Sequence, residues 1–232
     1  MGNLFSTYIY EPILAALVFI YNNLAFGDLG IAIILLTVVI RFILLPVFYK
    51  SAKDQTLLQK LQPHIKKIQL DHKDDKEKQA KALLELYRTN RLNPFSGIAL
   101  LIIQLPVFFA MFKIFSQGVS LPVFDNTLFF GFINLAERSI GIALIAAILQ
   151  YFQAKLTLPK GGGKKEQGMS QLASLGKTMT VVGPVITFVI LFNLPSALGI
   201  YWVTSTVFSI VQQFFINKKI NPDAKVPEEQ PA

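Results

Sequence analysis

The chain has 232 residues, of which 53% are hydrophobic and only 16% are charged, and its mean hydropathy is +0.49. A soluble domain of this size would normally carry about 25% charged residues, so the composition indicates an integral membrane protein. The formal net charge is +8. The chain contains no cysteine, which excludes a disulfide framework and a cysteine–zinc site.

The N-terminal segment is apolar over residues 8–26, but Glu11, Pro12 and the pair Asn22-Asn23 interrupt it. The uninterrupted part is too short to cross a bilayer core. We therefore expect residues 1–27 to form an amphipathic helix that lies in the interface on the extracytoplasmic side, with a sixth membrane span as the alternative. Residues 1–28 contain no Lys or Arg, so a cleaved signal peptide with a basic n-region is not expected.

Residues 28–50 predict the first membrane span. Between Leu29 and Tyr49, Arg41 is the one formal charge in 21 residues. An arginine at the centre of a membrane helix costs about 2.5–3.5 kcal/mol on insertion scales, so its surroundings must compensate it.

Four further apolar segments predict membrane spans at residues 94–115, 138–157, 177–193 and 197–217. Nineteen Lys and Arg residues lie in the connections on one side of these spans, and one, Arg138, lies on the other. By the positive-inside rule, the loop 158–176 and the tail 218–232 are cytoplasmic, and the loop 116–137 is extracytoplasmic. Lys113 lies near the outer end of the second span, where its amine can reach the interface.

The long cytoplasmic connection, residues 51–93, predicts a hairpin of two amphipathic helices. Leucine and isoleucine recur at helical spacing, the segment 70–77 breaks the pattern, and the pattern then resumes. Pro63 should kink the first helix or mark where its regular part begins. Eleven basic residues, Lys50 included, and six acidic residues give the hairpin a charge that suits anionic lipid, an acidic partner or ribosomal RNA. A solvated coiled-coil surface is the alternative.

The five predicted spans contain no Asp or Glu between their ends, so they offer Arg41 no carboxylate. They do offer neutral polar side chains: Thr37 lies one turn before Arg41, and the others are Gln104, Gln150, Gln153, Trp202, Ser205, Thr206, Ser209, Gln212 and Gln213. Each of these could simply be a hydrogen-bonding contact between helices. Together with an unpaired arginine, they predict a hydrated cavity that opens to the cytoplasm.

Four segments carry a resemblance to a known family: "GDLGIAIILLTVVIRFILLPVFYKSAK" (27–53), "LQPHIKKIQ" (61–69), "LYRTNRLNPFSGIALLIIQLPVFFAMF" (86–112) and "LPSALGIYWVTSTVFSIVQQ" (194–213). They resemble the YidC/Oxa/Alb membrane-protein insertases of the bacterial five-span type. The resemblance implies an all-α integral membrane protein with a five-transmembrane-helix bundle, a cytoplasmic helical hairpin and an N-terminal interfacial helix. It also implies a hydrophilic, cytoplasm-open groove, in which Arg41 matches the groove arginine, and Gln104 and Trp202 match groove-lining positions.

The expected substrate-binding groove is therefore lined by Arg41, Thr37, Gln104, Trp202, Ser205, Ser209 and Gln212. The resemblance implies an insertase and chaperone of the bacterial inner membrane that acts on nascent membrane proteins within the lipid bilayer. The ribosome and the Sec translocon are open as partners. The family needs no cofactor, no metal and no small-molecule substrate, so no enzyme activity is expected. The usual lipoprotein cysteine of many short bacterial forms is absent.

The sequence bears on three other functions. Coupled transporters show internal repeats and intramembrane carboxylates, and this sequence has neither. An intramembrane enzyme is disfavoured because both histidines, His64 and His72, fall in the cytoplasmic hairpin. An assembly chaperone without insertion activity stays open.

Overall fold

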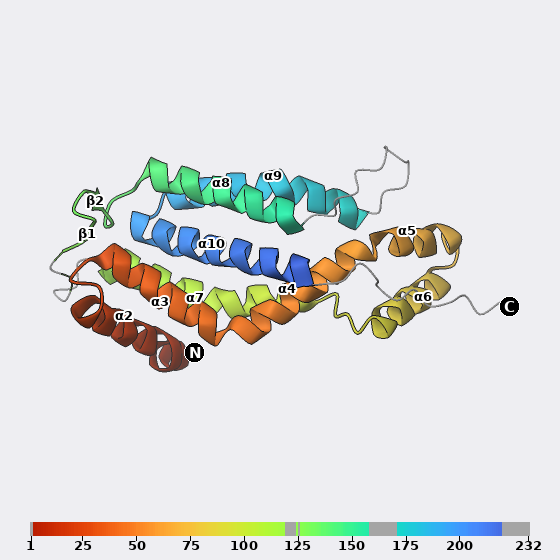
Figure 1. Cartoon of the computed structure of the whole chain (residues 1–232), viewed down its shortest axis with the longest axis horizontal. Coiled ribbons are helices and arrows are strands. Elements are labelled where there is room, and N and C mark those ends of the chain that lie inside the picture. Colours follow the sequence, from red (N-terminus) through yellow and green to blue (C-terminus); the bar gives the residue numbers. More distant parts are fainter. Residues whose placement is uncertain (1, 119–123, 125, 158–170, 220–232) are drawn as a thin grey trace.

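The computed structural model describes residues 2–118, 124, 126–157 and 171–219. Most of the predicted loop 158–176 and of the predicted tail 218–232 lies outside these residues. Figure 1 shows an elongated helical bundle, with a pair of short strands at one end and a helical hairpin at the other. We refer to these as the strand end and the hairpin end.

Helices make up nearly all of the described chain. Their bounds are α1 (Gly2–Phe5), the π-helical turn η1 (Ser6–Tyr10), α2 (Glu11–Asn23), α3 (Leu29–Ile43), α4 (Leu45–Lys60), α5 (Gln62–Asp71), α6 (Lys76–Thr89), α7 (Ser96–Gly118), α8 (Ile140–Thr157), α9 (Gln171–Phe192) and α10 (Ser196–Lys219). The expected all-α class thus holds apart from two short antiparallel strands, β1 (Leu128–Phe129) and β2 (Ile133–Asn134).

Helix α10 runs along the middle of the bundle, with α8 and α9 on one side and α3 and α7 on the other (Figure 1). Fully buried side chains from several helices form one continuous core around it, including Leu17, Ile33, Met111 and Leu198, each 0% exposed. Leu17 belongs to α2, so the N-terminal segment packs onto α3 and α7 through one face. Its orientation relative to a bilayer stays a prediction.

The segment expected as one continuous span over residues 28–50 is two helices, α3 and α4, which meet at an angle of 71°. The break falls at Leu44, one turn after Ile40 and just before the Leu45-Pro46 pair. Pro46 has no N–H to donate, and its ring would clash with the carbonyl four residues earlier, so a straight helix cannot continue through it. Arg41 therefore lies near the end of a 15-residue helix rather than in the middle of a longer one.

Helix length bears on which segments could cross a membrane. Within the described residues, α10 is long and apolar enough by itself, and the bent pair of α3 and α4 qualifies when taken as one span. Shorter apolar helical stretches are Ile102–Ser116, Ile140–Leu156 and Thr180–Phe192.

The strand end is joined to α3 through one carboxylate. Asp28 caps α3, since its Oδ1 accepts a hydrogen bond of 2.9 Å from the backbone N–H of Ile31. Its Oδ2 accepts one of 2.7 Å from the N–H of Phe130, in the turn between β1 and β2. In that turn Phe130 and Gly131 both have positive φ, 49° and 79°, as a type I′ turn requires. Gly30 lies directly against the Phe129 ring, which leaves no space for a Cβ.

The first turn of α10 is bonded to the same connection. The N–H of Ser196 donates to Glu137 O at 2.7 Å, and that of Ala197 donates to Leu135 O at 3.1 Å. These donors would otherwise lack partners within the helix. Backbone hydrogen bonds therefore close the bundle at the strand end.

The hairpin end has its own small core. Leu61, Ile65, Leu86 and Leu92 pack together between α5 and α6, apart from the main core. Pro63 lies in the first turn of α5, where a missing N–H costs nothing. Asp75 caps α6 by accepting a 3.0 Å hydrogen bond from the N–H of Lys78, and this bond lowers the pKa of the Asp75 carboxyl.

The two bonds of Asp28 give a stability prediction. Asp28→Ala removes a helix cap and the link to the Phe130 turn, and we expect the free energy of unfolding in detergent micelles to fall by about 2 kcal/mol. Asp75→Ala is the matched control, because Asp75 caps α6 in the same way within a single helix. Thermal denaturation should show the smaller loss for Asp75→Ala. Equal losses would mean that the bond to Phe130 adds nothing.

A second prediction concerns the crossing of α8 and α10. A Cβ at Gly199 would overlap the Ile142 side chain, and a β-branched residue has few other rotamers in a helix. Gly199→Ala should therefore lower the melting temperature despite its better helix propensity. Gly141→Ala is the control, since its nearest neighbour would be 3.9 Å away, and it should leave the melting temperature unchanged or raise it.

Candidate functional site

Arg41 lies on α3 where the bundle core meets α4, and its side chain is only 7% exposed. The bend after α3 brings Phe48 of α4 beneath it, with the guanidinium carbon 4.3 Å from the ring centroid, a cation–π contact. Among the described residues no carboxylate pairs with Arg41, and its buried Nη1 has no hydrogen-bond partner. The charge is thus covered by an aromatic ring and left incompletely bonded.

Helices α7 and α10 supply polar groups beside this charge. Tyr201 of α10 is 2% exposed, and its hydroxyl accepts a hydrogen bond from the Gln104 side-chain amide of α7. The same hydroxyl interacts electrostatically with Arg41. Ser205, one turn further along α10, is 6% exposed, and its buried Oγ lies next to the Tyr201 hydroxyl. We call Arg41, Phe48, Gln104, Tyr201 and Ser205 the arginine cluster.

Other hydroxyls of the expected groove are satisfied within their own helices. Thr37 donates to Ile33 O at 2.6 Å and is 1% exposed. Ser209 donates to Ser205 O at 3.0 Å, and Thr206 to Trp202 O at 2.8 Å. Such bonds to the preceding turn are common for these residues and use the hydroxyl proton, while the oxygen could still accept. Among the described residues none of these oxygens accepts from Arg41 Nη1, which has no hydrogen-bond partner.

Trp202 lies on a different side of α10 from Tyr201, because neighbouring helical residues point about 100° apart. Its indole N–H donates to Gln150 Oε1 of α8 at 3.1 Å, and Thr187 of α9 donates to the same oxygen at 2.5 Å. Its ring meets the Phe108 ring of α7 edge-on at 5.9 Å. Gln150 therefore connects three helices, and Trp202 belongs to this contact rather than to the arginine cluster.

A further polar group joins α4 to α10 toward the hairpin end. The Gln213 side-chain amide donates to Thr56 Oγ1 and to Asn217 Oδ1, in both cases at 2.8 Å. The Thr56 hydroxyl in turn donates to Asn217 Oδ1 at 3.1 Å. Gln213 is 3% exposed and Thr56 is 5% exposed. We call these three residues the Thr56 triad. Next to it, Gln212 has a buried side-chain nitrogen with no hydrogen-bond partner among the described residues.

The stripe expected on the last span is thus divided among three places: Ser205 in the arginine cluster, Trp202 at the Gln150 contact, and Gln213 in the Thr56 triad. Sequence reasoning did not single out Tyr201 or Phe48. The spacing contains a signal for Tyr201, which lies one turn before Ser205. It contains none for Phe48, because the bend at Leu44 separates that residue from the helix of Arg41.

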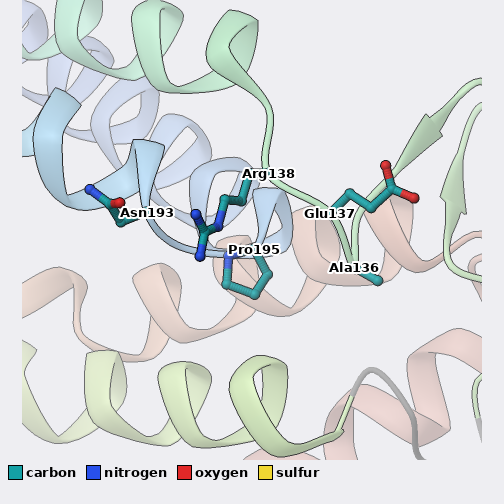
Figure 2. Close-up of a pocket in the computed structure, with 5 residues that line it drawn as sticks. All are labelled: Ala136, Glu137, Arg138, Asn193 and Pro195. Atoms are coloured by element: carbon teal, nitrogen blue, oxygen red, sulfur yellow. The ribbon is translucent and has the colours of Figure 1, made fainter.

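A surface pocket of about 550 Å³ lies at the strand end of the bundle, away from the arginine cluster. It is lined by Ala136, Glu137, Arg138, Asn193 and Pro195 (Figure 2). Glu137 accepts a 2.8 Å hydrogen bond from Asn134 and points away from Arg138. This pocket is therefore separate from the arginine cluster. Arg41 itself is almost completely buried, and the cavity expected around it stays a prediction.

Comparison with known proteins identifies the family. The family model "60Kd inner membrane protein" matches residues 19–224. A protein of Fusobacterium nucleatum called "Membrane protein insertase YidC" is 32% identical over 92% of this chain and 98% of its own length. Proteins with the same name from Geobacter sulfurreducens and Nitratidesulfovibrio vulgaris are 31% and 32% identical over 91% of this chain.

The chain spans most of the first of these relatives but only 37% and 39% of the other two, which are longer proteins. The match with the family model covers well over half of the chain and includes α3, α4, α7, α8, α9 and α10. The chain therefore belongs to the 60Kd inner membrane protein family.

Proposed function

We propose that this protein is a membrane protein insertase that inserts, and helps to fold, newly made inner-membrane proteins. The observation that carries the proposal is the similarity to the Fusobacterium nucleatum insertase, which extends over 98% of that protein. The groove through which insertion takes place is proposed to surround Arg41 and to open toward the cytoplasm. Its lining would comprise Thr37, Gln104, Trp202, Ser205, Ser209 and Gln212, with Tyr201 added from the geometry.

Five spans are proposed: the bent pair of α3 and α4, followed by α7, α8, α9 and α10. Helix α10 has 24 residues and would extend about 36 Å, enough to cross a bilayer core of about 30 Å. The sequence places most of the positive charge at the hairpin end, which would therefore be cytoplasmic, as would the C-terminus. The strand end and the N-terminal helix would then lie on the extracytoplasmic side, with that helix in the interface.

The mechanism requires no covalent chemistry. A polar groove reaching part of the way through the bilayer shortens the apolar distance that a polar segment must cross. An acidic side chain about 5 Å from Arg41 would gain about 3 kcal/mol at an effective dielectric constant of about 20. A membrane potential contributes about 2.3 kcal/mol per charge per 100 mV. The arginine and the potential would therefore attract an acidic tail with similar strength, while the hydrophobic segment of the substrate moves into lipid.

The partners of this activity are proposed to be nascent membrane proteins and the lipid bilayer. The basic hairpin of α5 and α6 offers a surface for the ribosome, and joint action with the Sec translocon is compatible with the same arrangement.

A chaperone that only holds its substrates is the competing function. Reconstitution of the purified protein into liposomes with a short single-span substrate separates the two, because only an insertase would make the substrate tail resistant to external protease.

The role of Arg41 can be tested in the same liposomes. Arg41→Ala should lower the insertion of a substrate with an acidic tail more than tenfold, because the lost attraction of about 3 kcal/mol exceeds the roughly 1.4 kcal/mol that corresponds to a factor of ten. Arg41→Lys should retain much of the activity, since it keeps the charge. Lys113→Ala is the control, because Lys113 contacts Tyr10 at the strand end instead. Full activity in both Arg41 variants would disprove the electrostatic role.

The proposed orientation gives a separate prediction. Phe132 at the strand end is 84% exposed and Leu70 at the hairpin end is 64% exposed, and the chain has no native cysteine. In spheroplasts, a membrane-impermeant maleimide should label Phe132→Cys directly and Leu70→Cys only after the membrane is permeabilised. The opposite labelling pattern would show that the protein is inserted the other way round.

A further inference from the structure

The Thr56 triad lies between the arginine cluster and the hairpin end. Thr56 belongs to α4, whereas Gln213 and Asn217 belong to the last turns of α10. Figure 1 shows α4 passing across the end of α10, so that side chains far apart in the sequence meet there. Both Thr56 and Gln213 are at least nine-tenths buried. The three hydrogen-bonded side chains therefore close the space between the two helices.

The stretch of α10 behind this contact is polar and incompletely bonded. From Tyr201 to Gln213 the helix rises about 18 Å. Two buried atoms without hydrogen-bond partners among the described residues lie on or beside this stretch, Arg41 Nη1 and Gln212 Nε2. A buried polar group without a partner is unfavourable. The closed packing thus leaves unsatisfied the groups that an entering polar chain, or water, would satisfy.

Helix α4 carries both Thr56 of the triad and Phe48, whose ring covers the Arg41 guanidinium. Phe48, which lies against the guanidinium, and Thr56 are two helical turns apart on the same helix. The helix joins α3 at Leu44, whose φ and ψ of −86° and 1° are not helical. A few residues with altered backbone angles are the usual form of a hinge. Rotation of α4 about Leu44 would therefore separate Thr56 from Gln213 and uncover Arg41 in one movement.

We propose that the Thr56 triad is the latch that closes the groove on its cytoplasmic side, and that α4 must part from α10 there before a substrate reaches Arg41. This inference rests on the proposed function and adds to it how access to the site is controlled. The buried Arg41 of this structure is then the latched state.

The latch can be locked by a reversible cross-link. Thr56→Cys and Gln213→Cys are combined in the cysteine-free chain and bridged with a short bifunctional methanethiosulfonate. The bridged protein, reconstituted in liposomes, should insert an acidic-tailed single-span substrate at least tenfold more slowly, and a thiol reductant should restore the rate. Equal insertion with and without the bridge would overturn the latch while leaving the insertase function intact.

A matched pair at the strand end controls for the chemistry. The side chains of Thr127 and Asn134 are hydrogen-bonded at 3.0 Å, so Thr127→Cys with Asn134→Cys accepts the same bridge. Bridging this pair should leave insertion unchanged. A wild-type chain that inserts no substrate would instead refute the proposed function, and the latch then has to be judged by a measurement that needs no substrate.

Water access to the groove is that measurement. In a Ser205→Cys chain, a further Thr56→Val removes the hydroxyl that joins α4 to Gln213, and a water-soluble maleimide should then label position 205 about five times faster. Thr204→Val is the matched control, because the Thr204 hydroxyl bonds only to Ile200 O in its own helix, at 2.8 Å. Labelling that is as slow with Thr56→Val as with Thr204→Val would overturn the latch.

Discussion

The central constraint on this molecule is a guanidinium held inside an apolar bundle without a carboxylate. A buried charge needs compensation, and here it comes from the face of Phe48, from the dipoles around Tyr201 and Gln104, and from nothing acidic in the described chain. A buried ion pair would have satisfied the arginine permanently. Leaving it unpaired keeps its attraction available for a negatively charged segment that comes from outside the protein.

The arrangement of helices follows from the need to build this environment. The break at Leu44 turns α4 so that Phe48 lies against Arg41, and α10 passes close to α8 at Gly199. Gln150 connects α8, α9 and α10 through a single amide oxygen. Side-chain amides and hydroxyls therefore join the helices at several levels along the bundle. Such hydrogen bonds can hold helices together in lipid.

The sequence predicted the helical class, the approximate positions of the long helices and the hairpin, because hydrophobic periodicity and length determine these directly. It did not predict the bend at Leu44, since a Leu-Pro pair can also be accommodated in a kinked but continuous span. It grouped Trp202 with Ser205, because a list of polar positions does not show which neighbour each side of α10 faces. Tyr201 was missed for the same reason, as its role depends on Gln104 of a helix about 100 residues away in the sequence.

The two ends of the bundle are fastened by different kinds of bond. At the strand end, main-chain donors of Ser196 and Ala197 and the carboxylate of Asp28 hold the loop to the helix starts. At the hairpin end, the neutral side chains of Thr56, Gln213 and Asn217 hold α4 to α10. Release of the main-chain bonds would leave the first N–H groups of α10 without partners, whereas side chains can rotate toward other partners. Thermal motion would consequently part the helices at the hairpin end more readily than at the strand end, so the proposed substrate path would open from one side.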